Sequence, residues 1–213
     1  MLTIGDNHFI GLEDIKNLLG IDDTSKDNVL IQLINATSQW LINAIGRDIM
    51  KNEYLEKKKG FNKQKMTVKY YPVREIKRIY NIATGVDLVP ADLINRSTNK
   101  FELEKGIIYL DSGFKAAGYN YGLEPDMYPI SRYIGISYVA GYVFPSQATD
   151  DEPCDLPADL VQVVIDKIKY DFYQSEMGID GLSSFSISDV SWGFKEAPTE
   201  EWLKVIGGYT EAF

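Results

Sequence analysis

The side chains that most often perform chemistry are scarce in this sequence. His8 is the only histidine and Cys154 is the only cysteine among 213 residues. These counts argue against a Ser-His-Asp triad, a Cys-His pair and a multi-histidine metal site, and they exclude an internal disulfide. The glycines do not have the spacing of a phosphate-binding loop. We expect His8 to be incidental and Cys154 to be an unreactive thiol in a polar loop.

Carboxylates are the remaining candidates for chemistry. They concentrate in the runs DNHFIGLED, residues 6–14, and ATDDEPCD, residues 148–155. Neither run has the alternating ligand positions, central glycine and closing glutamate of a calcium loop. A pair of acids across a cleft could serve a glycosidase, but the sequence favours no particular pair. We therefore predict no catalytic residue, no metal and no cofactor, and we keep a hydrolase acting through acidic residues of a β module as an alternative.

Aromatic side chains gather in the last 22 residues of the chain, at Trp192, Phe194, Trp202, Tyr209 and Phe213. They either complete the core or anchor a docking arm, because aromatic anchors carry much of the binding energy at protein interfaces. A short strand and a short helix at a terminus are marginal alone. We therefore predict that these five residues bind a partner protein.

Charge is distributed unevenly along the chain, whose net charge is −9. Residues 51–78 contain ten Lys/Arg and three Glu, whereas residues 145–213 contain fourteen Asp/Glu and four Lys/Arg. The net acidity argues against generic nucleic-acid coating. The basic stretch is either a solvated loop or an arm that pairs with the acidic end of another copy. Its candidates for a subunit interface or a DNA channel are Lys57, Lys58 and Lys59.

Helical spacing of apolar residues appears near both ends of the chain. It predicts helices over residues 12–19 and 28–47, a third after Pro157 that ends at Gly178, and a short one near residues 198–208. Asp27 and Asp155 are candidate N-caps for the second and third helices. In the second helix, Ile31 and Trp40 widen the apolar surface beyond one face. Such a helix needs two neighbours, which could be its own bundle and another subunit.

The middle of the chain changes to strand-like patterns. They predict strands in MTVKYYPV, REIKRIYNIA and YIGISYVAGYVF, and a hairpin in FELEKGIIYLDSG that turns at Lys105-Gly106. Near the C-terminus, SSFSISDVSWGF predicts one half-buried strand. The expected fold is α+β, a small helical bundle with an inserted antiparallel β module and a C-terminal strand-helix arm. The expected boundaries are residues 1–50 with 155–178 for the bundle, 51–154 for the β module, and 179–213 for the arm.

The order of several motifs resembles the head–tail connector (adaptor, or head-completion) proteins of tailed bacteriophages. These motifs are LEDIKNLLGI, LIQLINATSQWLINAIGRDI, YYPVREI, GYVFP and LPADLVQVVIDKIKYDFYQ. The likeness spans about residues 10–82 and 133–178, and residues 83–132 depart from it as an enlarged β-rich middle. It implies a helical-bundle protomer without catalytic residues and a cyclic ring of roughly a dozen copies.

The resemblance also implies where the protein works and what it contacts. The ring would lie beneath the portal protein of the virion, at the head–tail interface, after assembly in the cytoplasm of a host bacterium. A stopper or tail-completion protein would bind below it, and genomic DNA would pass through its centre without sequence-specific binding. We expect no membrane partner, because the apolar stretches are far shorter than a membrane span and no signal peptide is apparent. Another ring-forming tail component, such as a tail terminator, remains an alternative.

Overall fold

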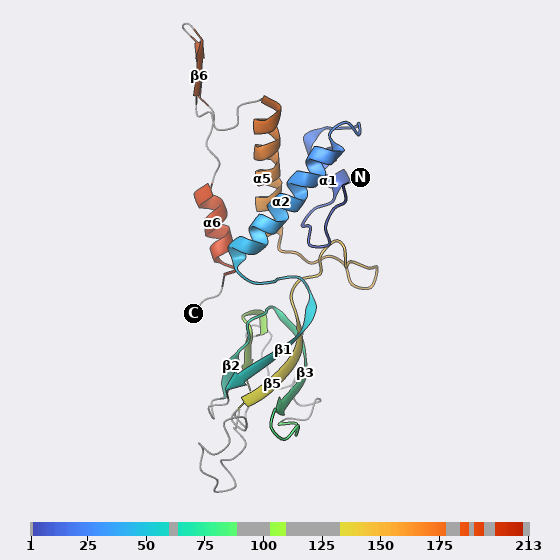
Figure 1. Ribbon diagram of the computed structural model, residues 1–213, viewed down its shortest axis with the longest axis vertical. Coiled ribbons are helices and arrows are strands. Elements are labelled where there is room, and N and C mark those ends of the chain that lie inside the picture. The colour runs from blue at the N-terminus through green and yellow to red at the C-terminus, as the bar shows by residue number, and fades with distance from the viewer. Residues whose placement is uncertain are drawn as a thin grey trace. The chain divides into compact units, whose positions relative to one another are not determined.

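The computed structural model divides into two compact units, one helical and one built on β strands (Figure 1). The helical unit comprises residues 1–47 and 143–213, and the β unit comprises residues 48–142. This arrangement confirms the α+β class, with strands inserted between helices. The structure describes residues 2–59, 64–88, 103–109, 133–177, 184–187, 190–193 and 199–210.

The helical unit contains the four helices that apolar spacing predicts. They are α1 (Leu12–Leu19), α2 (Asp27–Ile45), α5 (Ala158–Met177) and α6 (Thr199–Gly207). Gly20 and Gly46 end α1 and α2 in the left-handed conformation, which glycine adopts without strain. α2 packs against α1, α5 and α6, and Figure 1 shows α2 and α5 side by side. The expected end of α5 at Gly178 lies outside the described residues.

Asp27 is the first residue of α2 rather than its cap, which corrects the expectation from the sequence. Its carboxylate lies 3.1 Å from the Lys16 ammonium group of α1. The hydrogen bond to Asp27 raises the pKa of Lys16, whose side chain is almost fully buried. The carboxylate is therefore used to join two helices and not to cap one.

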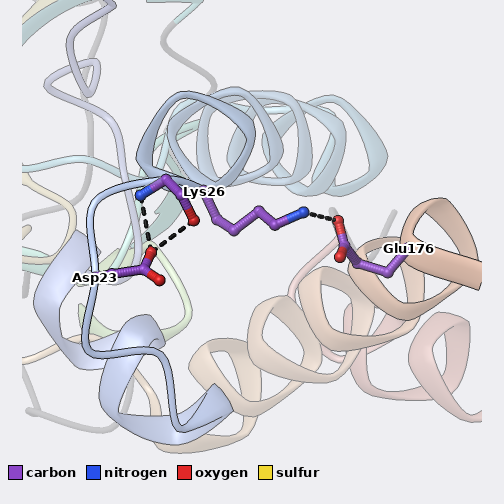
Figure 2. Close-up of polar contacts among 4 residues, drawn as sticks. Asp23, Lys26 and Glu176 are labelled. Carbon is purple, nitrogen blue, oxygen red and sulfur yellow. Dashed lines mark hydrogen bonds and ion pairs between the residues drawn. The ribbon is translucent and has the colours of Figure 1, made fainter.

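The turn that enters α2 is also fixed to the end of α5. Asp23 accepts hydrogen bonds from the backbone N–H and the hydroxyl of Ser25, at 2.8 and 2.6 Å, and these bonds lower the pKa of Asp23. The next residue, Lys26, places its ammonium group 2.5 Å from Glu176 (Figure 2). Because this pair is exposed, we expect it to orient the two helices more than to stabilise them.

Residues 143–155 form a loop that clusters with the helices and not with the strands. The ring of Phe144 packs edge-to-face on Phe9, with 5.0 Å between the ring centroids. Asp155 was expected to cap α5, but its carboxylate instead accepts the backbone N–H of Val143 at 2.6 Å. The Asp155 N–H donates in turn to the Val143 carbonyl, at 3.2 Å. These bonds close the base of the loop.

The described residues of the β unit form a three-stranded and a two-stranded antiparallel sheet. The strands are β1 (Asn52–Lys59), β2 (Lys65–Thr67), β3 (Val73–Asn81), β4 (Ile107–Tyr109) and β5 (Tyr133–Ala140). β5 lies between β1 and β3, and β2 pairs with β4 (Figure 1). One face of β5 supplies the centre of the core, with Ile134, Ile136, Tyr138 and Ala140 all buried.

Two strand predictions differ from the structure. Residues 107–109 pair with β2, so the expected hairpin around Lys105-Gly106 is wrong for this strand. The SSFSISDVSWGF stretch forms a hairpin of two short strands, β6 (Ser184–Ile187) and β7 (Val190–Gly193), where one strand was expected. In both cases the strands are only three or four residues long. Such a short strand shows too little alternation of apolar and polar residues to predict which strand it pairs with.

Candidate interaction site

Side chains of the three-stranded sheet that point away from the core form an exposed surface, which we call the outer sheet face. Adjacent strands bring them into register, since Leu55 pairs with Ser137 and Lys57 pairs with Gly135. Leu55 is 68% exposed, the largest exposed fraction of any large apolar side chain in the described part of the chain. The face consists of Glu53, Leu55, Lys57, Lys59, Glu75, Lys77, Arg78, Tyr80, Tyr133, Gly135, Ser137 and Val139.

Aromatic rings hold two of the cations on the outer sheet face. The Lys57 ammonium group lies 4.2 Å from the centre of the Tyr133 ring, and the Arg78 guanidinium lies 4.5 Å from that of Tyr80. Tyr80 crosses Gly135 so closely that a Cβ there would stand 2.4 Å from the ring. Glycine at position 135 therefore lets the ring lie flat on the sheet. Cation–π contacts limit the freedom of long basic side chains before any partner binds.

Lys77 and Arg78 of this face each lie beside an acid. Lys77 and Glu53 are 2.6 Å apart, and their hydrogen bond raises the pKa of Lys77 and lowers that of Glu53. Arg78 lies 2.5 Å from Asp87. The face is thus mixed in charge and carries an exposed leucine, a composition that suits a protein partner better than a phosphate backbone.

The three consecutive lysines of the basic stretch do not act together. Strand geometry directs Lys57 and Lys59 to the outer sheet face and Lys58 to the opposite side. There the Lys58 ammonium group lies 2.9 Å from Glu56. Of the three predicted interface lysines, Lys57 and Lys59 therefore lie on the same face of the sheet. Lys58 instead forms an ion pair with Glu56 inside the β unit.

Glu56 is the centre of a polar network beneath the sheet. It accepts the hydroxyl of the fully buried Tyr138 and the backbone N–H of Lys69, the latter at 2.8 Å. Tyr138 in turn accepts the Tyr70 N–H at 3.2 Å. Burial, followed by the hydrogen bond to Glu56, raises the pKa of Tyr138. The network ties the segment between β2 and β3 to the sheet.

Replacing Tyr138 with phenylalanine is expected to lower the free energy of unfolding by about 1–3 kcal/mol, because Glu56 and the Tyr70 N–H lose a buried partner. Native Tyr138 keeps its proton to higher pH than the unfolded chain does. The wild type should therefore lose stability as the pH rises above about 10, and the variant should lose less. Urea unfolding at pH 7 and pH 11 measures both effects. Equal stability of the two proteins at pH 7 would contradict the network.

Of the five C-terminal aromatic residues, Trp202 and Tyr209 have described side chains, and both contact other parts of the helical unit. Trp202 of α6 is buried, and its ring centroid lies 6.2 Å from that of Trp40 and 6.5 Å from that of Tyr170. The Lys167 ammonium group approaches both indole rings, at 5.4 Å from Trp40 and 6.0 Å from Trp202. α6 is thus docked on α2 and α5 of the same chain, and it covers Trp40, which belongs to the apolar surface that predicted a second subunit.

The other predicted interface residues fall in different surroundings. Tyr209 donates its hydroxyl to Asp159 at 2.7 Å, and its carbonyl accepts Arg47 at 3.3 Å. Ile31 is buried within the helical unit. Trp192 belongs to β7, whereas Phe194 and Phe213 lie outside the described residues. The docking role of the five aromatic residues stays a prediction.

His8 and Cys154 both belong to the helical unit. His8 contacts the Gly5 carbonyl through Nδ1 at 2.7 Å, and Cys154 is exposed on the 143–155 loop. Among the described residues, no three His, Cys, Asp or Glu side chains are grouped so that they could hold a metal ion. In the same part of the chain, every helix is too short or too polar to cross a membrane.

Comparison with solved structures finds matches in gene transfer agent particles. A chain from the virion of a native gene transfer agent particle is 15% identical, with a TM-score of 0.47 over 99% of this chain and 93% of that chain. Chains from the necks of empty and native gene transfer agent particles, computed with C6 and C12 symmetry, are each 13% identical. Their TM-scores are 0.48 and 0.47, over 100% of this chain and 94% of theirs. No curated protein matches the chain.

A family model gives the assignment directly. The model described as head completion protein matches residues 8–176, which include α1, α2, all but the last residue of α5, and every described strand of the β unit. The match covers far more than half of the chain and agrees with the resemblance read from the sequence motifs. The chain belongs to the head completion protein family and is a structural head–tail connector.

Proposed function

We propose that copies of this protein form a closed ring of about a dozen members beneath the portal, through which the genome passes. The observation that carries this proposal is the family match over residues 8–176, because it includes the β unit and most of the helical unit. The ring belongs to the virion and assembles in the bacterial cytoplasm.

The charge of the two units supports a head-to-tail ring. The β unit has fifteen Lys/Arg and eleven Asp/Glu, whereas the helical unit has seven and twenty. A ring interface joins two different surfaces of identical copies, so a basic and an acidic unit can meet repeatedly around the axis. The remaining net charge of −9 per copy would keep the DNA from adhering to the channel wall.

The ring has the portal protein on one side and a stopper or tail-completion protein on the other in this proposal. Residues 179–213 supply the portal contact through Trp192, Phe194 and Phe213, because Trp202 and Tyr209 already have partners within the helical unit. The protein works by geometry and carries out no catalysis.

Inactivating the gene in the phage or prophage that encodes it is expected to yield heads without tails and to abolish infectivity, because the tail has no surface to join. A wild-type copy should restore tails, whereas a Trp192→Ala copy should not, although its urea unfolding should match the wild type. Electron microscopy of the particles provides the measurement. Normal tailed particles without the gene would overturn the proposed function, and normal tails with Trp192→Ala would overturn only the role of the arm.

A further inference from the structure

We propose that the outer sheet face of one copy binds α1 of the neighbouring copy. This inference rests on the proposed ring and assigns its interface to named surfaces. In the bound arrangement Leu55 packs against Leu18 of the neighbour, and Lys57 pairs with Asp14 of the neighbour.

The outer sheet face combines an exposed leucine with a cation that is held in place before any partner binds. Leu55 stands in the middle of β1 and is 68% exposed. Two residues further along the strand, the Lys57 ammonium group lies over the Tyr133 ring. Lys77 and Arg78 already lie beside acids, whereas Lys57 has no ion pair with an acid in the described part of the chain. Lys57 can therefore pair with an acid of another chain.

The surface around Leu55 is low enough for a helix to lie across it. Ser137 is opposite Leu55 on the central strand, and Gly135 is opposite Lys57. The Tyr80 ring of β3 covers Gly135, since a Cβ there would stand 2.4 Å from the ring. The middle of the face therefore carries a hydroxyl and a flat ring instead of long side chains.

α1 has the matching composition on its exposed side, which we call the acidic face of α1. This face consists of Glu13, Asp14, Asn17 and Leu18, with Leu18 48% exposed. The one basic residue of the helix, Lys16, is buried and lies 3.1 Å from Asp27. The acidic face thus presents a leucine and carboxylates without a competing cation.

α1 is fixed to its own unit, so the acidic face keeps its shape. Ile15 is fully buried beneath the helix, and the Gly20 N–H donates to the Asn17 carbonyl at 3.4 Å, which closes the C-terminal end. At the other end the Asp14 carboxylate stands near Gly11, where the positive end of the helix dipole favours a negative charge. Little conformational freedom is therefore lost when this face binds.

The two surfaces also match in spacing. Asp14 and Leu18 are four residues apart on a helix, or about 6 Å along its axis. Leu55 and Lys57 are two residues apart on a strand, or about 7 Å. If α1 lies antiparallel to β1, Leu18 therefore rests on Leu55 while Asp14 reaches Lys57.

α1 fits this face better than α6, which carries the other exposed leucine of the described helices. Leu203 is 52% exposed, but it stands next to Lys204, which is also exposed. α6 lies outside residues 8–176 of the family match, whereas α1 and β1 both lie inside it. We expect a contact that builds the ring to lie in the region that the family shares.

The contact joins two different surfaces, as a head-to-tail ring requires. The outer sheet face belongs to the basic β unit, and α1 belongs to the acidic helical unit. If each copy gives its α1 to one neighbour and its sheet to the other, the contact repeats until the ring closes.

Cysteine cross-linking tests the contact directly. The native cysteine is removed by Cys154→Ser, and Leu18→Cys is combined with Leu55→Cys. The protein is assembled on the portal and treated with a short bis-maleimide cross-linker. We expect a ladder of covalent oligomers on a denaturing gel. Neither new cysteine alone should give a ladder, and neither should Leu203→Cys in place of Leu18→Cys.

A charge exchange gives an independent readout. Lys57→Glu should raise the concentration needed for half-maximal assembly by roughly tenfold, and Asp14→Lys should raise it as well. The double variant should be impaired far less than the two single effects combined, because the pair is rebuilt with its signs reversed. Comparing the four proteins removes any separate effect of Asp14→Lys on α1. Additive effects would contradict the pair.

The outcomes separate this contact from the ring itself. Rings that form without a ladder, a cross-link confined to single chains, or a ladder that appears with Leu203→Cys instead would each overturn the proposed contact. A wild-type protein that forms no ring on the portal would overturn the proposed function.

Discussion

Replacing Trp202 with alanine is expected to lower the free energy of unfolding of the helical unit by about 3–5 kcal/mol, the range for truncating a large buried aromatic side chain. Trp202 is only 5% exposed, and it packs with Trp40 of α2 and Tyr170 of α5. With nine residues, α6 is too short to persist as a helix without this packing. Urea unfolding followed by circular dichroism measures the loss.

Leu203→Ala is the matched control for Trp202→Ala. Leu203 is the next residue of α6 and is 52% exposed, so its truncation should change the free energy of unfolding by less than about 0.5 kcal/mol. Hydrogen exchange should also show that α6 loses protection in Trp202→Ala alone. If the two variants unfold at the same urea concentration, α6 does not depend on Trp202 for its position.

Replacing Gly141 with alanine is expected to destabilise the β unit by about 3–5 kcal/mol, because a disfavoured backbone conformation and a clash act together. Gly141 has a φ of 102°, and a Cβ there would stand 2.5 Å from the Met50 carbonyl oxygen. The surrounding backbone is fixed, since the Gly141 N–H donates to the Pro72 carbonyl and its own carbonyl accepts Arg74 at 2.6 Å. Urea unfolding of the whole chain measures the effect.

Gly85→Ala separates strain from the clash. Gly85 also has a positive φ, of 69°, but no atom lies within 4 Å of the position that its Cβ would occupy. Its substitution should lower the free energy of unfolding by about 1–2 kcal/mol, the cost of the left-handed conformation alone. If both variants lost the same free energy of unfolding, the clash with the Met50 carbonyl oxygen would contribute nothing to the effect of Gly141→Ala.

The helices could be predicted from the sequence because their apolar residues recur at helical spacing and glycine follows α1 and α2. The predicted span of α1 agrees with the structure at both ends, and that of α2 agrees to within two residues. Burial of Leu30, Ile34 and Leu41 confirms the predicted apolar face of α2. We expected another subunit to cover the second apolar stripe of α2. In the structure α6 of the same chain covers Trp40, and this contact between distant segments cannot be predicted from composition.

β1 could not be recognised as a strand by its pattern of apolar residues. Its inward positions are Tyr54, Glu56 and Lys58, and its one leucine, Leu55, points outward. Side chains of β1 alternate between partly buried and exposed, but apolar and polar residues do not alternate in the same way. The reason is that a polar network, and not apolar packing, lies beneath this strand. The lysines were therefore expected in a loop or an arm, and their separation onto two faces became visible only in the structure.

Mass measurement of the protein mixed with its portal tests the central claim most directly. Native mass spectrometry of the purified complex should show a single species that contains the portal ring and about a dozen copies of this chain, in agreement with a closed cyclic assembly. A chain that stays monomeric at every ratio to the portal would contradict the account, because neither a ring nor a head–tail connection could then be built from it.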